Sequence, residues 1–166
     1  VNAADLWQQS LAIVQEIQNK SLEVITLNQI ANAYLNQKKY EKAIEIYQQA
    51  LSIAEKLPNN RSQEAYIITG IGDVYNNQEK YQLGLKYYQQ ALTIAREARD
   101  KSRELIILQE IGYIYLSQKQ YEQSIKIYEQ ALPIAREVKN KSREGNILTA
   151  IGDAYKNQEK YEPALK

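Results

Sequence analysis

The sequence predicts an all-α protein built as an array of repeated helix pairs, and two observations support that prediction. First, tyrosines and alanines recur at fixed offsets with a period of about 40 residues. Second, each period holds two segments in which apolar residues follow the spacing of an amphipathic helix. The recurring positions are Tyr34, Tyr40, Tyr47, Ala50 and Ala54, then Tyr75, Tyr81, Tyr88, Ala91 and Ala95, then Tyr115, Tyr121, Tyr128, Ala131 and Ala135.

The chain opens on a single helix, which we expect over residues 3–17. Trp7 and Leu11 stand forty residues before Tyr47 and Leu51, so this segment aligns with the second helix of the next repeat. We therefore assign residues 1–19 to a truncated repeat that is represented by its second helix only.

Three full repeats follow, at residues 21–58, 61–99 and 101–139, and a truncated repeat occupies residues 141–166. We expect first helices over 22–37, 63–78, 102–118 and 142–158, and second helices over 41–57, 82–99 and 122–139. The last repeat keeps only the first turn of its second helix. Asp100 and Asn140, or Ser102 and Ser142, are the alternative N-caps of the last two first helices. Residues 1–166 thus form a single array.

Small residues recur at one register of the first helices and at one register of the second helices. Glycine inside a helix costs about 1 kcal/mol relative to alanine. Because this cost is repeated, we expect the two helices of a pair to cross too closely for a Cβ atom. The positions are Ala31, Gly72, Gly112 and Gly152 on the first helices and Ala43, Gly84, Ser124 and Ala164 on the second helices.

The composition argues against an enzyme and against a metal site. The 166 residues carry a net charge of +1 and include no cysteine and no histidine. The chain therefore lacks the commonest metal ligand and the commonest general base. No apolar run approaches the ~20 residues of a membrane helix, and no phosphate loop or nucleophile turn occurs. We expect a cytoplasmic, non-enzymatic protein without cofactor, metal or membrane span.

Arginines gather at the turns between repeats, where glutamates accompany them. We expect these charges to pair with one another in solvent rather than to contact phosphates, and we expect no nucleic-acid binding. The residues are Arg96, Arg99, Arg103, Arg136 and Arg143, with Glu97, Glu104, Glu137 and Glu144.

The chain resembles the tetratricopeptide repeat family. In the third repeat, Gly112, Tyr115, Ser124, Tyr128 and Ala131 match the family's pattern of small and large residues. The period exceeds the usual length of about 34 residues and is similar to the subclass found in kinesin light chains. Residues 131–144 are similar to bacterial, often cyanobacterial, arrays. The resemblance implies antiparallel helix pairs in a right-handed superhelix, an α-solenoid. It also implies a concave groove, lined by the first helices, that binds a peptide or a helix of another protein.

A second stripe on the first helices, next to the apolar one, is expected to face this groove. Asparagine recurs there although it is a poor helix former, and its amide can both donate to and accept from a peptide backbone. Leu35, Tyr113 and Leu116 are the expected apolar anchors. The candidate ligand-binding residues are Asn28, Asn32, Leu35, Asp73, Asn77, Gln109, Tyr113, Leu116 and Asp153.

The stripe is mildly acidic because it includes Asp73, Glu110 and Asp153. It lacks the basic residues with which chaperone-binding members of the family hold a C-terminal carboxylate. We therefore expect a neutral or basic peptide or protein as the partner. The alternative is a structural role, as a spacer in a larger chain or as an element that associates end to end with another copy through its apolar ends.

Overall fold

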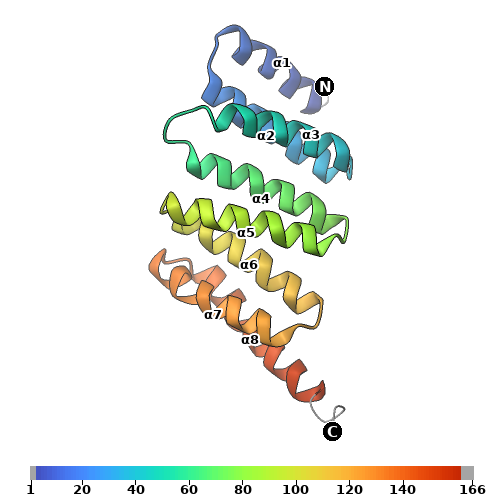
Figure 1. The fold of residues 1–166 in the computed structure, drawn as a ribbon, viewed down its shortest axis with the longest axis vertical. Helices are drawn as coiled ribbons and strands as arrows, with labels where there is room; N and C mark the ends of the chain where they lie inside the picture. Colours follow the sequence, from blue (N-terminus) through green and yellow to red (C-terminus); the bar gives the residue numbers. More distant parts are fainter. Residues whose placement is uncertain (1–2, 162–166) are drawn as a thin grey trace. The chain divides into compact units, whose positions relative to one another are not determined.

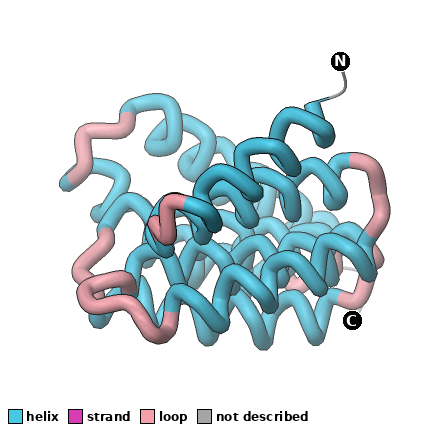
Figure 2. Tube along the Cα trace, turned by 90° about the horizontal axis from the view of Figure 1, so that it is seen from above, coloured by secondary structure: helices cyan, strands magenta, loops and turns pink. Residues whose placement is uncertain are grey.

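The computed structural model describes residues 3–161, with side chains for residues 6–158. These residues form eight helices joined by short turns, with no strand (Figure 2). The prediction of an all-α fold is therefore confirmed. The expected first turn of the last second helix, with Ala164, lies outside the described residues. The helices are α1 (Ala3–Glu16), α2 (Lys20–Asn36), α3 (Tyr40–Ala54), α4 (Arg61–Asn77), α5 (Tyr81–Glu97), α6 (Lys101–Ser117), α7 (Tyr121–Glu137) and α8 (Lys141–Tyr161).

The helices belong to two compact units, Val1–Ala98 and Arg99–Lys166. In the first unit, each helix from α1 to α5 packs on the next one in sequence, and α2 also touches α4 (Figure 1). In the second unit, α6 packs on α7 and α7 packs on α8. Consecutive packing of this kind is what a repeat array requires, because each helix pair buries its apolar face against its neighbours.

The turns between helices are closed by a residue in the left-handed conformation. After α2, Lys38 has a φ of 56°. Its N–H donates to the Leu35 carbonyl at 2.8 Å, and the Lys39 N–H donates to the Tyr34 carbonyl at 2.9 Å. This pair of bonds is the Schellman motif, which normally prefers glycine at the left-handed position. None of the left-handed residues here is a glycine; they are Gln18, Lys38, Asn59, Glu79, Arg99, Lys119 and Lys139.

The N-caps of the first helices are the residues directly before them. The Asp100 side chain accepts from the Arg103 N–H at 2.9 Å, and the Asn140 side chain accepts from the Arg143 N–H at 3.1 Å. The structure thus selects these two residues over Ser102 and Ser142, which lie inside α6 and α8.

Two helix ends differ from expectation. The second helix α3 ends at Ala54 rather than near residue 57, ahead of the insertion around Asn59. The last first helix, α8, runs on to Tyr161 rather than ending near residue 158. In α8 the residue equivalent to Lys119 is Glu159, and it is helical. The same sequence, Asn-Gln-Glu-Lys-Tyr, ends α4 at Asn77 with a left-handed Glu79, so local propensity does not explain the continuation of α8.

The glycines of the first helices make room for tyrosine rings. A Cβ atom on Gly72 would lie 2.7 Å from the Tyr88 ring, and one on Gly112 would lie 2.8 Å from the Tyr128 ring. The expected contact with a helix backbone is therefore wrong at these two positions. At Gly152 no atom of the described residues lies within 4 Å of a Cβ atom, so no close packing explains that glycine.

The close crossing of helix backbones is found instead at the small residues of the second helices. A Cβ atom on Gly84 would lie 3.4 Å from the Gly72 carbonyl oxygen. The Ser124 hydroxyl donates to the Gly112 carbonyl oxygen at 2.9 Å. The helices therefore approach closely at this register, but a Cβ atom at Gly84 would be in ordinary contact, so the expectation that no Cβ atom fits is wrong here as well.

Candidate functional site

In the first unit, Asn32 on α2 is held in place by two tyrosine hydroxyls. The Tyr47 hydroxyl, from α3, donates to Asn32 Oδ1 at 2.5 Å. Asn32 Nδ2 in turn donates to the Tyr66 hydroxyl of α4 at 3.0 Å. Burial of the Tyr47 hydroxyl, and secondarily the charge of Asp73, raises the pKa of this tyrosine. Tyr47 therefore keeps its proton at neutral pH, and the Asn32 amide has one defined orientation across three helices.

The same arrangement recurs one repeat later with a carboxylate. The Tyr88 hydroxyl, from α5, donates to Asp73 Oδ1 on α4 at 2.6 Å. Tyr88 is fully buried, whereas Asp73 is partly exposed. Next to it, the exposed Asn77 donates through Nδ2 to the Asp73 carbonyl at 2.8 Å. Buried tyrosines of the second helices thus fix polar groups that stand on the first helices.

Two other predicted residues of the first unit are less accessible. Asn28 is only 2% exposed, and neither its amide oxygen nor its amide nitrogen has a hydrogen-bond partner. Its amide is therefore not presented at the surface. Leu35 is half-buried and packs against the core around Tyr47.

The predicted residues of the second unit lie on α6 and α8. Gln109 accepts a hydrogen bond from the Arg143 guanidinium, which links the two helices. Tyr113 is 57% exposed. Leu116 is half-buried and Asp153 is exposed.

The sequence did not reveal the tyrosine partners, because Tyr47 and Tyr88 stood out in it only as recurring positions of the repeat. A signal was present. The spacing from Asn32 to Tyr47 is the same as the spacing from Asp73 to Tyr88. A buried hydroxyl needs a partner, so a polar residue at a fixed offset from each tyrosine was the place to look.

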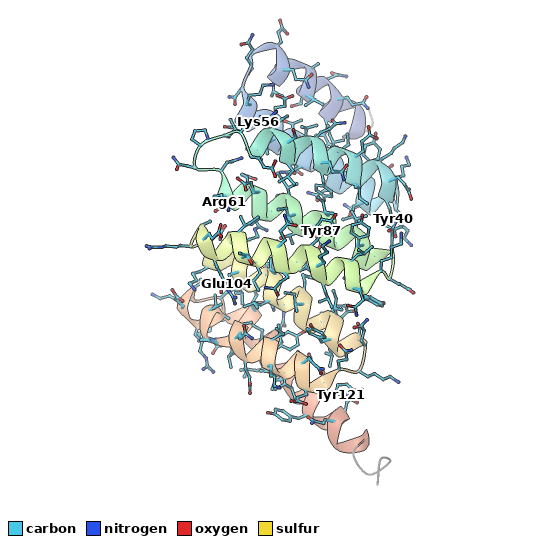
Figure 3. All side chains as sticks on the ribbon, viewed as in Figure 1. Tyr40, Lys56, Arg61, Tyr87, Glu104 and Tyr121 are labelled. Atoms are coloured by element: carbon cyan, nitrogen blue, oxygen red, sulfur yellow. The ribbon has the colours of Figure 1, made fainter. Side chains whose placement is uncertain are left out.

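A glutamate near the start of each first helix forms an ion pair, which the sequence analysis expected only in part. Arg61 lies at the start of α4 (Figure 3). It bonds to Glu64 at 2.6 Å and to Glu97 at 2.5 Å. Arg136 of α7 bonds to Glu144 of α8 at 2.8 Å. Pairing of the turn charges is thus confirmed for Arg136, while Glu97 is paired with an arginine outside the predicted set.

The structure adds two findings about the described part of the chain. No helix there is both long enough and apolar enough to cross a membrane. No group of three or more acidic side chains is placed to hold a metal ion among these residues.

Comparisons with known proteins agree on the fold. Among solved structures, the chain is similar to BtubC (BKLC) from P. vanneervenii, with a TM-score of 0.81 at 19% identity over 96% of this chain and 66% of that one. It is similar to a Rap protein complexed with competence and sporulation factor, with a TM-score of 0.81 at 16% identity over 96% of this chain and 48% of that one. It is also similar to a putative kinesin light chain of Podosopora anserina with TPR-like repeats, with a TM-score of 0.72 at 17% identity over 98% of this chain and 80% of that one.

The chain thus spans about two thirds of BtubC and about half of the Rap protein. No curated protein matches its sequence. The family model described as tetratricopeptide repeat matches residues 1–60, 62–137 and 103–166. Together with the 40-residue period and the consecutive helix pairs, this match shows that the chain belongs to the tetratricopeptide repeat family.

Proposed function

We propose that this chain is a protein–protein interaction scaffold that binds a neutral or basic peptide, or a partner helix, on the exposed face of its first helices. The observation that supports this most is the fixed polar pair of the first unit. Asn32 and Asp73 are partly exposed, and each is held by the hydroxyl of a buried tyrosine. Groups that are already ordered lose little entropy on binding, so they hold a ligand more tightly than mobile ones do.

The face of α6 supports the same function in the second unit. Tyr113 is exposed there beside Gln109, whose orientation is set by Arg143. Exposed aromatic side chains often carry much of the energy of an interface. Among similar structures, the Rap protein was solved in complex with competence and sporulation factor. That complex is consistent with a scaffold role for an array of this fold.

The test must avoid the residues that hold the core. Replacing Asn32 or Asp73 by alanine would remove a hydrogen bond of a buried tyrosine hydroxyl, which is destabilising in its own right. Tyr113→Ala and Asn77→Ala are better variants because both residues are exposed. The control is Gln89→Ala, an exposed residue of the second helix α5.

The experiment is a screen of a random peptide library displayed on phage, followed by measurement of Kd for the selected peptides. We expect the Tyr113 or the Asn77 variant to weaken binding by about tenfold, which is the cost of losing one good contact of about 1.4 kcal/mol. The control is expected to bind as tightly as the unchanged protein. Selected peptides that bind all three variants equally, or that are strongly acidic, would contradict the proposal.

Self-association is the second candidate function, and exposed apolar side chains favour it. Leu6 and Ile13 on α1 are 53% and 58% exposed, and Leu148 and Tyr155 on α8 are 47% and 49% exposed. In an intact helix pair, the Tyr88 ring of the second helix packs over Gly72 of the first helix. The space over the equivalent Gly152 of α8 is open, so α8 of one copy can receive α1 of another copy there.

Analytical ultracentrifugation over a wide concentration range tests this second candidate. We expect the sedimentation coefficient to rise with concentration, and we expect Gly152→Glu to prevent that rise by placing a charge in the contact. A monomer at every concentration would exclude self-association.

A further inference from the structure

A pocket of about 520 Å³ lies in the first unit where α1, α2 and α3 meet, away from the predicted ligand-binding stripe. Its lining residues combine carboxylates, side-chain amides, a hydroxyl and two apolar side chains. Glu23 and Leu27 of α2 are buried, and the residues from α1 and α3 surround them. The lining residues are Gln15, Glu23, Leu27, Glu45, Gln48, Gln49, Ser52 and Ile53.

The second unit shows how the equivalent glutamate, Glu144, which is partly exposed, is neutralised there. There, Glu144 receives Lys141 at 2.8 Å from its own helix and the Arg136 guanidinium at 2.8 Å from the preceding helix. In the first unit, Glu23 receives Lys20 at 2.7 Å from its own helix. The place of Arg136 is taken by Gln15, which stands the same eight residues ahead of its glutamate.

Glu23 therefore lacks the second cation that Glu144 has. The Gln15 amide donates to Glu23 Oε1 at 2.9 Å, so the hydrogen bond is kept while the positive charge is lost. The hydrogen bond from Lys20 holds the pKa of Glu23 below its ordinary value, and the carboxylate stays ionised at neutral pH. Glu45 adds a second negative charge to the pocket; it is exposed and forms no ion pair with any described residue.

An arginine side chain has the chemistry that this pocket can accept. Its guanidinium carries five N–H donors in a planar fork and no acceptor. The pocket offers carboxylate oxygens from Glu23 and Glu45 together with the side-chain oxygens of its glutamines and Ser52. Leu27 and Ile53 supply apolar surface for the aliphatic stem of the arginine. A lysine ammonium has fewer donors and lacks the planar fork.

We propose that the pocket between α1, α2 and α3 is a second recognition site, which binds an arginine side chain of a partner protein. In this pocket the arginine would take the position that Arg136 has beside Glu144 in the second unit. The site is independent of the peptide-binding face proposed above, because none of the candidate residues of that face lines the pocket. A partner that uses it would meet the array on helices α1 and α3.

The probe is the capped pentapeptide acetyl-Ala-Leu-Arg-Leu-Ala-amide, titrated into the ¹⁵N-labelled chain and followed by NMR. We expect shifts of the backbone amides of Gln15, Gln49 and Ser52. The matched peptide with citrulline in place of arginine has the same shape without the charge. We expect it to bind about tenfold more weakly, because a hydrogen bond between charged groups is about twice as strong as a neutral one.

Two variants and one control separate binding from folding. Gln15→Arg restores the arrangement of Arg136 and Glu144, so it should fill the pocket, abolish binding and leave the melting temperature unchanged or higher. Glu45→Gln should weaken binding about 1.5-fold to fivefold, the range for an exposed ion pair. Glu41→Gln removes a charge from the same helix outside the pocket and should have no effect.

Three results would overturn the proposal. These are equal affinity for the arginine and citrulline peptides, unchanged binding by the Gln15→Arg variant, and no binding by the unchanged chain. Shifts confined to Asn32, Asp73 and Asn77 would also overturn it, and they would instead support the peptide-binding face of α2 and α4.

Discussion

The contact between Gly72 and the Tyr88 ring predicts that one chemical change has different effects at two glycines of the first unit. Both Gly72 and Gly84 lie inside helices, where a change to alanine favours folding by about 1 kcal/mol. At Gly84 the new Cβ atom would be 3.4 Å from the nearest atom, which is ordinary contact. We therefore expect Gly84→Ala to raise the free energy of unfolding by about 0.5–1 kcal/mol.

At Gly72 the new Cβ atom would lie 2.7 Å from a ring carbon of Tyr88. This ring has no simple way to move, because Tyr88 is fully buried and its hydroxyl is bonded to Asp73. Insertion of an extra carbon into a packed core costs about 1–3 kcal/mol. This cost exceeds or cancels the gain in helix propensity, so we expect Gly72→Ala to lower the free energy of unfolding by up to about 2 kcal/mol.

The assay is urea unfolding of both variants and the unchanged chain, followed by circular dichroism. Because both glycines belong to the same compact unit, the two variants report on the same transition. We expect the midpoint of Gly84→Ala to rise and that of Gly72→Ala to fall or stay unchanged, with a difference of about 0.5–3 kcal/mol between the variants. If Gly72→Ala stabilises the chain as much as Gly84→Ala does, the Tyr88 ring is not the reason for the glycine.

Three further predictions concern other sites. Asn28→Thr should raise the free energy of unfolding by about 1–2 kcal/mol, because the amide of Asn28 is buried without a hydrogen-bond partner. The equivalent residue of the next repeat, Thr69, bonds to the Ala65 carbonyl at 2.7 Å. A drop in the thermal melting temperature would contradict this prediction. Lys119→Gly should stabilise the second unit by about 0.5–1 kcal/mol, because relief of a left-handed φ of 60° outweighs the greater freedom of glycine in the unfolded chain. The control Lys126→Gly, inside α7, should destabilise by about 1 kcal/mol, and chemical denaturation measures both. Burial, and secondarily the Glu110 carboxylate, raises the pKa of Tyr128 to about 12 from its ordinary value of 10.0. As pH rises between these two values, the tyrosine of the unfolded chain loses its proton first, so the free energy of unfolding falls. Tyr128→Phe should make that fall less steep in a series of denaturant titrations, and an unchanged slope would count against the pKa shift.

The helix pattern could be predicted from the sequence because the residues that pack the repeats recur at constant offsets. Ala43 and Ala91 are fully buried small residues, and Tyr47 and Tyr88 are fully buried large ones. The turns were harder to predict in detail. Residues such as Lys38 and Glu79 take a left-handed conformation that glycine normally supplies, and nothing in their chemistry marks them for it.

The candidate site was predicted only in part. Asn77 and Tyr113 are exposed on first helices as expected, but Asn28, on the same predicted stripe, is buried. A stripe drawn from helical periodicity gives the direction of a side chain from its own helix. It does not say whether a neighbouring helix covers that direction.

By itself, the sequence determined that this protein is an array of repeated helix pairs, because the period of its packing residues admits few other ways to bury them. Only the tertiary structure decided which polar groups are held, which are hidden and where a pocket remains. Tyr47 holds Asn32, whereas Gln15 stands where the second unit has an arginine. The physical reason is that hydrogen bonds and ion pairs between helices depend on distances of a few tenths of an ångström. Those distances follow from how the helices pack and not from the spacing of residues along any one of them.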